Sequence, residues 1–187
     1  MSSADLEMEE LIDGCKSGDR KSQQQIYKLF YGKMYGVCLR YTKNEDQAKD
    51  ILQDGFIKVF NSIEKYNFQG SFEGWVRRIV VNTAIDFFRK SKTDFVLLGD
   101  EQAMEDFSEV VDDEEDEEGE YDFKASQVIE AMNELSPAYR TIFNLYLFEN
   151  LTHKEIAEKL DISVGTSKSN FAKAKKNIKK ILIKAYK

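Results

Sequence analysis

An acidic segment at residues 94–123 constrains how the rest of this 187-residue chain can fold. The segment carries 15 Asp and Glu side chains and no Lys or Arg, and it includes the run D-D-E-E-D-E-E-G-E. Such a segment repels itself and is too polar to be buried, so it predicts a flexible linker. The chain therefore divides into a block at 1–93, a linker at 94–123 and a block at 124–187, and each block can form one small domain.

The linker also accounts for the net charge of −7. Residues 1–93 carry 15 basic and 13 acidic side chains, whereas residues 124–187 carry 12 basic and 6 acidic ones. The two blocks are neutral to basic, so the acidity of the whole chain does not exclude nucleic-acid binding. Three roles are open for the linker: a spacer, an autoinhibitory segment that covers basic surfaces, and a divalent-metal site. The metal site is the weakest of these hypotheses, because the acids lie in an unstructured run.

Long amphipathic runs fill both blocks, and a single proline, Pro137, interrupts them. With 42% hydrophobic residues and few turn signals, the sequence predicts an all-α protein of two small helical domains joined by the acidic linker. In the first block, the spacing of apolar residues predicts helices over 5–16, 20–41, 45–63 and 72–90. Asn44 and Ser71 are expected to cap the last two of these helices.

Several classes of protein are disfavoured by the sequence. The N-terminus is acidic and lacks an apolar stretch, so we expect no secretion signal, and no run approaches the length of a membrane span. Cys15 and Cys38 are isolated, which is typical of reduced thiols in a cytoplasmic protein. We expect His153, the only histidine, to be a solvated first-turn residue. No metal site and no cofactor are expected.

The stretch from Thr152 to Lys176 predicts two short helices held at a sharp angle. Thr152 and Glu155 match a capping box for the first helix, and Ser163 can cap the second. In the second helix we expect four side chains on the inner face: Val164, Phe171, Ala174 and Ile178. The outer face would carry Thr166, Lys168, Ser169, Asn170 and Lys173. This pattern is typical of a helix-turn-helix that enters the DNA major groove, although an ordinary helical hairpin with a solvated basic helix would have the same caps.

The first block combines an aromatic loop with a basic helix. The loop reads Tyr66-Asn67-Phe68-Gln69-Gly70, and in the helix that follows we expect Trp75, Ile79, Ala84 and Phe87 or Phe88 to be buried. The remaining surface of that helix would carry Arg77, Arg78, Asn82, Arg89 and Lys90. Aromatic and cationic side chains together can stack unpaired bases and bind phosphates, but a buried aromatic core with a basic rim would look the same.

Segments of both blocks resemble the bacterial sigma factors. D-Q-A-K-D-I-L-Q-D-G-F-I-K-V-F and G-S-F-E-G-W-V-R-R-I-V-V-N-T-A-I-D-F-F-R-K are similar to sigma region 2. L-S-P-A-Y-R-T-I-F-N-L-Y and the helix-turn-helix stretch are similar to region 4. The order of the two regions, with no domain between them, resembles the extracytoplasmic-function group of the sigma-70 family. The resemblance covers about residues 10–92 and 125–183.

The resemblance implies a subunit of RNA polymerase that directs promoter-specific initiation. Region 2 would bind core polymerase through Asp50, Gln53, Asp54 and Lys58. It would also melt and read the −10 element through Tyr66, Asn67, Phe68, Trp75, Arg77, Arg78, Asn82, Thr83, Arg89 and Lys90. Region 4 would read the −35 element through Gly165, Thr166, Lys168, Ser169, Asn170 and Lys173. The partners implied are core RNA polymerase, promoter DNA and an anti-sigma factor, with no direct insertion into a membrane.

Three positions depart from the family pattern: Ser167 where a valine is common, and Asn170 and Lys173 where arginines are common. A serine on the buried stripe weakens packing unless its hydroxyl bonds back to a helix carbonyl. Lysine lacks the bidentate fork that suits guanine, and asparagine can pair with adenine. The sequence thus predicts a −35 contact that tolerates adenine and depends mainly on the DNA backbone.

Two other functions remain open. The chain could be a stand-alone helix-turn-helix regulator that binds duplex DNA without polymerase, or a polymerase-docking adaptor that does not read DNA. An enzyme is not expected, because the sequence has no nucleophile–base pair, no glycine-rich phosphate loop and no cluster of metal ligands.

Overall fold

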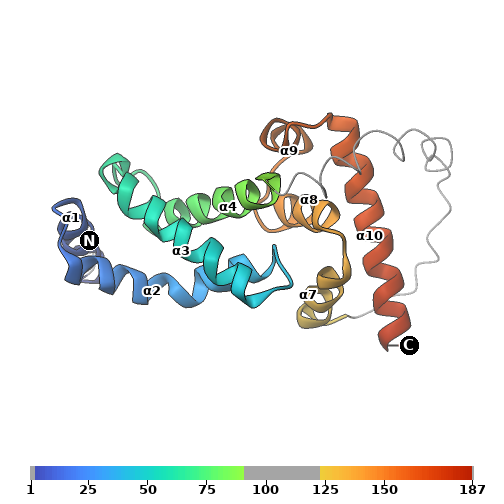
Figure 1. The fold of residues 1–187 in the computed structure, drawn as a ribbon, viewed down its shortest axis with the longest axis horizontal. Coiled ribbons are helices and arrows are strands. Elements are labelled where there is room, and N and C mark those ends of the chain that lie inside the picture. Colours follow the sequence, from blue (N-terminus) through green and yellow to red (C-terminus); the bar gives the residue numbers. More distant parts are fainter. Residues whose placement is uncertain (1–2, 91–122, 187) are drawn as a thin grey trace. The chain divides into compact units, whose positions relative to one another are not determined.

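The computed structural model describes residues 3–90 and 123–186, and the regular secondary structure in these ranges is all helical, as the sequence predicts (Figure 1). The chain separates into two compact units, Met1–Phe87 and Phe88–Lys187, and each has buried apolar residues of its own. The predicted linker lies outside the described residues except at its end, where Phe123 packs against the core of the second unit.

The first unit begins with two helices that pack on each other, α1 (Ser3–Lys16) and α2 (Arg20–Leu39). They are followed by α3 (Glu45–Ser62), the 3-10 helix η1 (Ile63–Lys65) and α4 (Phe72–Lys90). Two predicted caps are confirmed. The Asn44 side chain accepts hydrogen bonds from the backbone N–H groups of Asp46 and Gln47, and Ser71 Oγ accepts one from the Gly74 N–H.

Helix α4 crosses α3 where a glycine allows close approach. A Cβ atom added at Gly55 would lie 3.0 Å from Val80 Cγ2, so a larger residue would require the Val80 side chain to shift. The buried face of α4 includes Phe72, Val76 and Val80. The predicted face is therefore wrong in part, because Trp75 and Ile79 are only half-buried.

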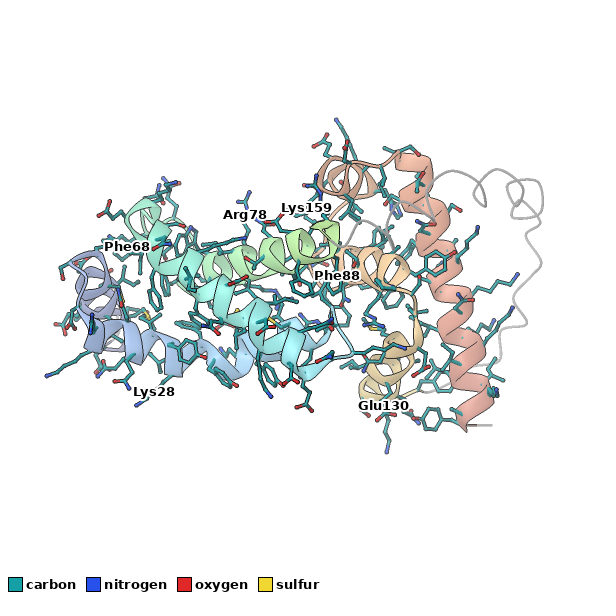
Figure 2. The ribbon with its side chains drawn as sticks, viewed as in Figure 1. Lys28, Phe68, Arg78, Phe88, Glu130 and Lys159 are labelled. Carbon is teal, nitrogen blue, oxygen red and sulfur yellow. The ribbon has the colours of Figure 1, made fainter. Side chains whose placement is uncertain are left out.

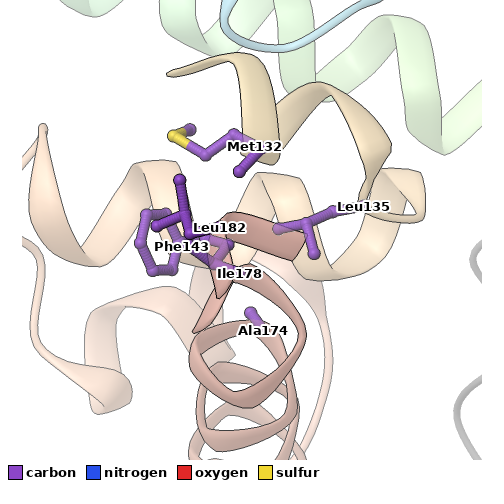
Figure 3. Packing of buried hydrophobic residues seen from close by; sticks show 7 residues of the cluster. Met132, Leu135, Phe143, Ala174, Ile178 and Leu182 are labelled. Carbon is purple, nitrogen blue, oxygen red and sulfur yellow. The ribbon is translucent and has the colours of Figure 1, made fainter. Parts of the chain in front are cut away.

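The second unit contains α7 (Ala125–Glu134), α8 (Pro137–Leu147), α9 (His153–Leu160) and α10 (Val164–Tyr186). Its apolar core joins α7, α8 and α10, as Figure 3 shows for Met132, Leu135, Phe143, Ala174, Ile178 and Leu182. Helix α10 is 23 residues long, so the expectation that the second helix of the pair is short is wrong. Its extra turns supply Ile178 and Leu182 to this core.

A buried arginine joins α7 to α8. Arg140 is buried, and its guanidinium group donates hydrogen bonds of 2.9–3.0 Å to the carbonyl oxygens of Met132, Asn133 and Leu135. These carbonyls lie at the C-terminus of α7, where a helix runs out of intrahelical donors, and only that of Met132 also accepts a backbone bond, from the Leu135 N–H at 3.1 Å, among the bonds that the structure describes. The cation also lies at the negative end of the α7 dipole, which favours its charge.

The described helices carry no long apolar span that could cross a membrane. Within residues 3–90 and 123–186 no group of His, Cys, Asp or Glu side chains could hold a metal ion. Cys15 and Cys38 are buried as free thiols. Burial raises the pKa of Cys15 to about 11 and that of Cys38 to about 12, so both thiols stay protonated and unreactive near neutral pH.

Candidate nucleic-acid interface

Contacts within the loop between η1 and α4 hold it in one shape. Tyr66 is buried, and its hydroxyl donates a hydrogen bond of 2.8 Å to the Gly70 carbonyl. Asn67 Oδ1 accepts a 3.3 Å bond from the Gln69 N–H. Phe68 has a φ of 61°, which is uncommon for a bulky residue, and its ring is 44% exposed. The backbone thus adopts a costly conformation that turns a large apolar ring to solvent, which is typical of a functional site.

Phe68 is the outermost member of an aromatic cluster formed by Tyr66, Phe68, Phe72 and Trp75. The centroid of Tyr66 lies 5.1 Å from those of Phe68 and Phe72 and 5.4 Å from that of Trp75. Figure 2 shows Phe68 at the loop and Arg78 on α4. An exposed ring supported by packed rings offers a rigid platform on which an unpaired base can stack.

The remaining predicted −10 residues on α4 differ in exposure: Arg78 and Arg89 are exposed, Arg77 and Asn82 are half-buried, and Thr83 is buried. The Thr83 hydroxyl donates a 2.9 Å hydrogen bond to the Ile79 carbonyl within the helix. In this structure Thr83 packs inside the unit, and its hydroxyl does not face outward. The side chain of Lys90 lies outside the described residues.

The polar face of α3 is exposed as expected. Asp50, Gln53 and Asp54 are exposed, and Lys58 forms a 3.2 Å ion pair with Asp86 of α4. Ile57 was not predicted, yet it is 50% exposed and follows Asp50, Gln53 and Asp54 at helical spacing. An exposed isoleucine among carboxylates is suited to a partner that offers both apolar and cationic side chains. The sequence signal that could have placed Ile57 on this exposed face is its helical spacing from Asp50.

The predicted helix-turn-helix is present in α9 and α10. The capping box of Thr152 and Glu155 is formed, and Ser163 Oγ accepts a 2.9 Å hydrogen bond from the Thr166 N–H. Glu155 accepts two hydrogen bonds from Thr152, which lower the pKa of its carboxyl group. Asp161 ends α9 in the left-handed conformation, with φ 57°, and so turns the chain towards α10.

The predicted −35 residues lie along the first turns of α10. Lys168 is exposed, whereas Gly165, Thr166, Ser169 and Lys173 are half-buried. Two orientations predicted from the sequence are wrong: Asn170 is 6% exposed, and Val164 is 42% exposed. The buried stripe of α10 therefore includes Ser167, Asn170 and Ala174, because the contacts with α8 and α9 decide which face is covered.

Ser167 and His153 form a pair that links α9 to α10. Ser167 has no exposed surface, and its Oγ is hydrogen-bonded to His153 Nδ1 at 3.0 Å. The imidazole also stacks on Tyr146, with centroids 4.7 Å apart, and contacts Phe171 edge-on at 5.6 Å. The expectation that His153 is solvated is thus wrong. Burial and, secondarily, the charge of Lys168 lower the pKa of His153, so the imidazole is neutral near pH 7.

Comparison with known proteins matches both units to one family. The family model of sigma-70 region 2 matches residues 26–93, and that of sigma-70 region 4 matches residues 125–178. The first match contains most of α2, all of α3 and α4, and it leaves out α1. The second contains α7, α8, α9 and most of α10.

The full-length relatives agree with these matches. The chain is 30% identical over 176 residues to the ECF RNA polymerase sigma factor SigW of Bacillus subtilis, which covers 91% of this chain and 94% of SigW. It is 33% identical over 142 residues to the sigma factor SigV of the same organism, which covers 76% of this chain and 80% of SigV. In fold it is similar to the sigma factor RpoE from Bartonella quintana, solved with the anti-sigma factor NepR. There the TM-score is 0.50 at 17% identity, over 88% of this chain and 98% of RpoE.

Proposed function

The chain belongs to the extracytoplasmic-function group of the sigma-70 family, and from this membership we propose how its two units share promoter recognition. It is a sigma factor that directs promoter-specific initiation of transcription. In the proposal, the first unit binds core RNA polymerase and opens the −10 element, and the second unit binds the −35 element as duplex. The observation that carries this division is an aromatic cluster with the exposed ring of Phe68 on one unit and a capped helix-turn-helix on the other.

At the −10 element, a base extruded from the duplex would stack on Phe68, while Asn67 contacts its edge. Arg78 and Arg89 are exposed on α4 and would bind the phosphates of the unpaired strand, with Arg77 and Asn82 beside them. Base stacking on an aromatic side chain contributes about 1–3 kcal/mol per base and does not require a specific sequence. The base edge contacts would then add the specificity.

At the −35 element, the first turns of α10 would enter the major groove. Thr166, Lys168, Ser169 and Lys173 are the side chains best placed to contact bases and phosphates. Asn170 is buried in the free protein, so we assign it to packing rather than to adenine recognition. The lysine-rich remainder of α10 would add contacts with phosphates, which makes binding sensitive to salt.

Core polymerase would dock on α3 through Asp50, Gln53 and Asp54, with Ile57 as an apolar anchor among them. Lys58 is paired with Asp86 and would mainly fix α3 against α4. An anti-sigma factor is a further proposed partner, and the site of action is the cytoplasm, where RNA polymerase is found. The proposed role is regulatory and needs no catalytic residues.

Two alternatives make different predictions. A stand-alone regulator would bind a specific duplex tightly without polymerase, whereas a sigma factor needs core enzyme for specific binding. A docking adaptor that does not read DNA would tolerate the loss of Arg77, Arg78 and Lys173.

Runoff transcription tests the proposal. Core polymerase with the purified chain is given a library of random promoters, and the transcribed templates are sequenced. We expect productive initiation from templates that share a paired −35 and −10 consensus. Transcription no better than that of core enzyme alone, with protein shown to be folded, would overturn the proposed function.

A further inference from the structure

We propose that α1 contributes Lys16 to the single-stranded DNA site, where its ammonium group binds the phosphate next to the base that stacks on Phe68. The inference rests on the proposed −10 role of the aromatic cluster and adds a binding residue to it. The match to sigma-70 region 2 begins at residue 26, so it assigns no role to α1.

The geometry brings α1 to the edge of the loop at two positions. Lys16 Nζ lies 4.6 Å from the centroid of the Phe68 ring and 3.4 Å from Asp13 Oδ1, and the Lys16 side chain is only 26% exposed. Further back along α1, Glu9 lies near Tyr66, where its charge adds to the effect of burial and raises the pKa of the Tyr66 phenol. Helix α1 also packs on η1, just before the loop.

In the free protein, the Lys16 ammonium group therefore occupies the ring face that a base would need. A cation over an exposed aromatic ring is stabilised by about 0.5–1 kcal/mol. A base stacked on an aromatic ring gains about 1–3 kcal/mol, so the base displaces the cation. The ammonium group of lysine is carried on a flexible four-carbon stem, so it can leave the Phe68 ring while α1 stays in place. The phosphate of the incoming nucleotide then becomes the new partner of the ammonium group.

Lys16 differs in charge from the other ionisable residues of α1. It is the only basic residue of this helix, which otherwise carries Asp5, Glu7, Glu9, Glu10 and Asp13. These acids disfavour DNA along most of α1, and the single cation lies at the end of the helix that meets Phe68. A phosphate is thus favoured at this end and disfavoured elsewhere on α1.

The test uses the full chain bound to core polymerase. The probe is a fork-junction DNA, taken from a promoter selected by runoff transcription, with a duplex −35 element and a single-stranded −10 element. Affinity is measured by fluorescence anisotropy at several salt concentrations for wild type, K16A, K16M and K16R. The matched control is K49A, because Lys49 forms the same 3.4 Å pair with an aspartate three residues away but lies on α3.

We expect K16A and K16M to bind about 3–10-fold more weakly than wild type and to flatten the salt slope by about 0.7, the value for one phosphate of a single strand. K16R should keep both affinity and slope, and K49A should match wild type. If K16A and K16M match K49A, or bind more weakly with an unchanged slope, the phosphate contact is overturned. Thermal unfolding of each variant checks that the first unit remains folded.

F68A distinguishes this failure from failure of the proposed function. If F68A weakens binding to the fork junction while K16A matches K49A, the aromatic cluster keeps its −10 role and only the inference about Lys16 is lost. If both F68A and K16A bind like wild type, the proposed −10 role of the loop is overturned together with it.

Discussion

At the scale of single residues, the side chains of Ser167 and His153 are hydrogen-bonding partners of each other. A buried serine hydroxyl without a hydrogen-bond partner would destabilise the second unit. A valine in place of Ser167 would take the hydrogen-bond partner away from His153 Nδ1. Their 3.0 Å bond satisfies both groups, and the stacking of the imidazole on Tyr146 fixes the ring. The departure at Ser167 from the family pattern therefore places a hydroxyl group opposite the imidazole of His153 on the facing helix α9.

A double-mutant cycle tests this pairing. We expect Ser167→Ala and His153→Phe each to lower the free energy of unfolding of the second unit by about 1 kcal/mol, and the double variant to lose less than the sum. The coupling energy should be about 0.5–1.5 kcal/mol. Urea denaturation followed by circular dichroism measures it. The fluorescence of Trp75, the only tryptophan, reports on the first unit and should not change; additive losses would rule out the pairing.

The stability of the second unit should also depend on pH through His153. Because burial and Lys168 lower its pKa in the folded state, the unfolded chain binds more protons once the pH falls below the unfolded value of 6.5. The contribution is therefore complete above that value and is lost as the pH falls through the lower, folded pKa. We expect the urea midpoint of the second unit to fall between about pH 7.5 and pH 5, and to fall less in His153→Phe. An equal fall in both proteins would contradict the assignment.

At the scale of helices, the caps were predicted correctly and the buried faces only in part: Ala84, Ala174 and Ile178 are buried as expected. Asn44, Ser71, Thr152 and Ser163 cap the helices that their positions predict, because a cap depends on residues within one turn. The buried faces depend on partner helices instead. Periodicity alone predicted that Trp75 is buried and Asn170 exposed. In the structure, the neighbouring helices leave Trp75 half-buried and cover Asn170. No sequence pattern could pair His153 with Ser167, which lies 14 residues away on another helix.

Two glycines test how closely α1 and α2 pack. A Cβ atom at Gly14 would lie 2.2 Å from Ser22 Oγ and 2.8 Å from Ser22 Cβ, whereas one at Gly32 meets nothing within 4 Å. We expect Gly14→Ala to lower the free energy of unfolding of the first unit by about 1–3 kcal/mol through overpacking. Gly32→Ala should raise it by about 0.5–1 kcal/mol, because alanine favours helix more than glycine does. Urea unfolding monitored by Trp75 fluorescence compares them, and shifts of the same sign would refute close packing at Gly14.

At the scale of the whole molecule, the acidic side chains are concentrated in one segment, residues 94–123, between two neutral-to-basic blocks. Residues 124–187 carry 12 basic and 6 acidic side chains and include the lysine-rich α10, yet the segment before them carries 15 acidic side chains. At low salt, the field of such a segment extends over a distance comparable to a small domain, so we expect the segment to repel DNA or to compete with DNA for the lysines. We expect this effect to weaken as salt shortens the screening length.

Neutralising the acidic run should therefore raise the affinity of the free factor for DNA. Replacing the eight acids of residues 112–120 with Ser and Gly changes the net charge from −7 to +1. We expect non-specific duplex binding to tighten by about tenfold near 0.05 M salt, and the difference to disappear near 0.5 M, because the Debye length then falls well below 10 Å. A variant with the same acids in scrambled order keeps the charge and should match wild type. Equal affinities for neutralised and wild-type protein at low salt would leave the segment as a spacer only.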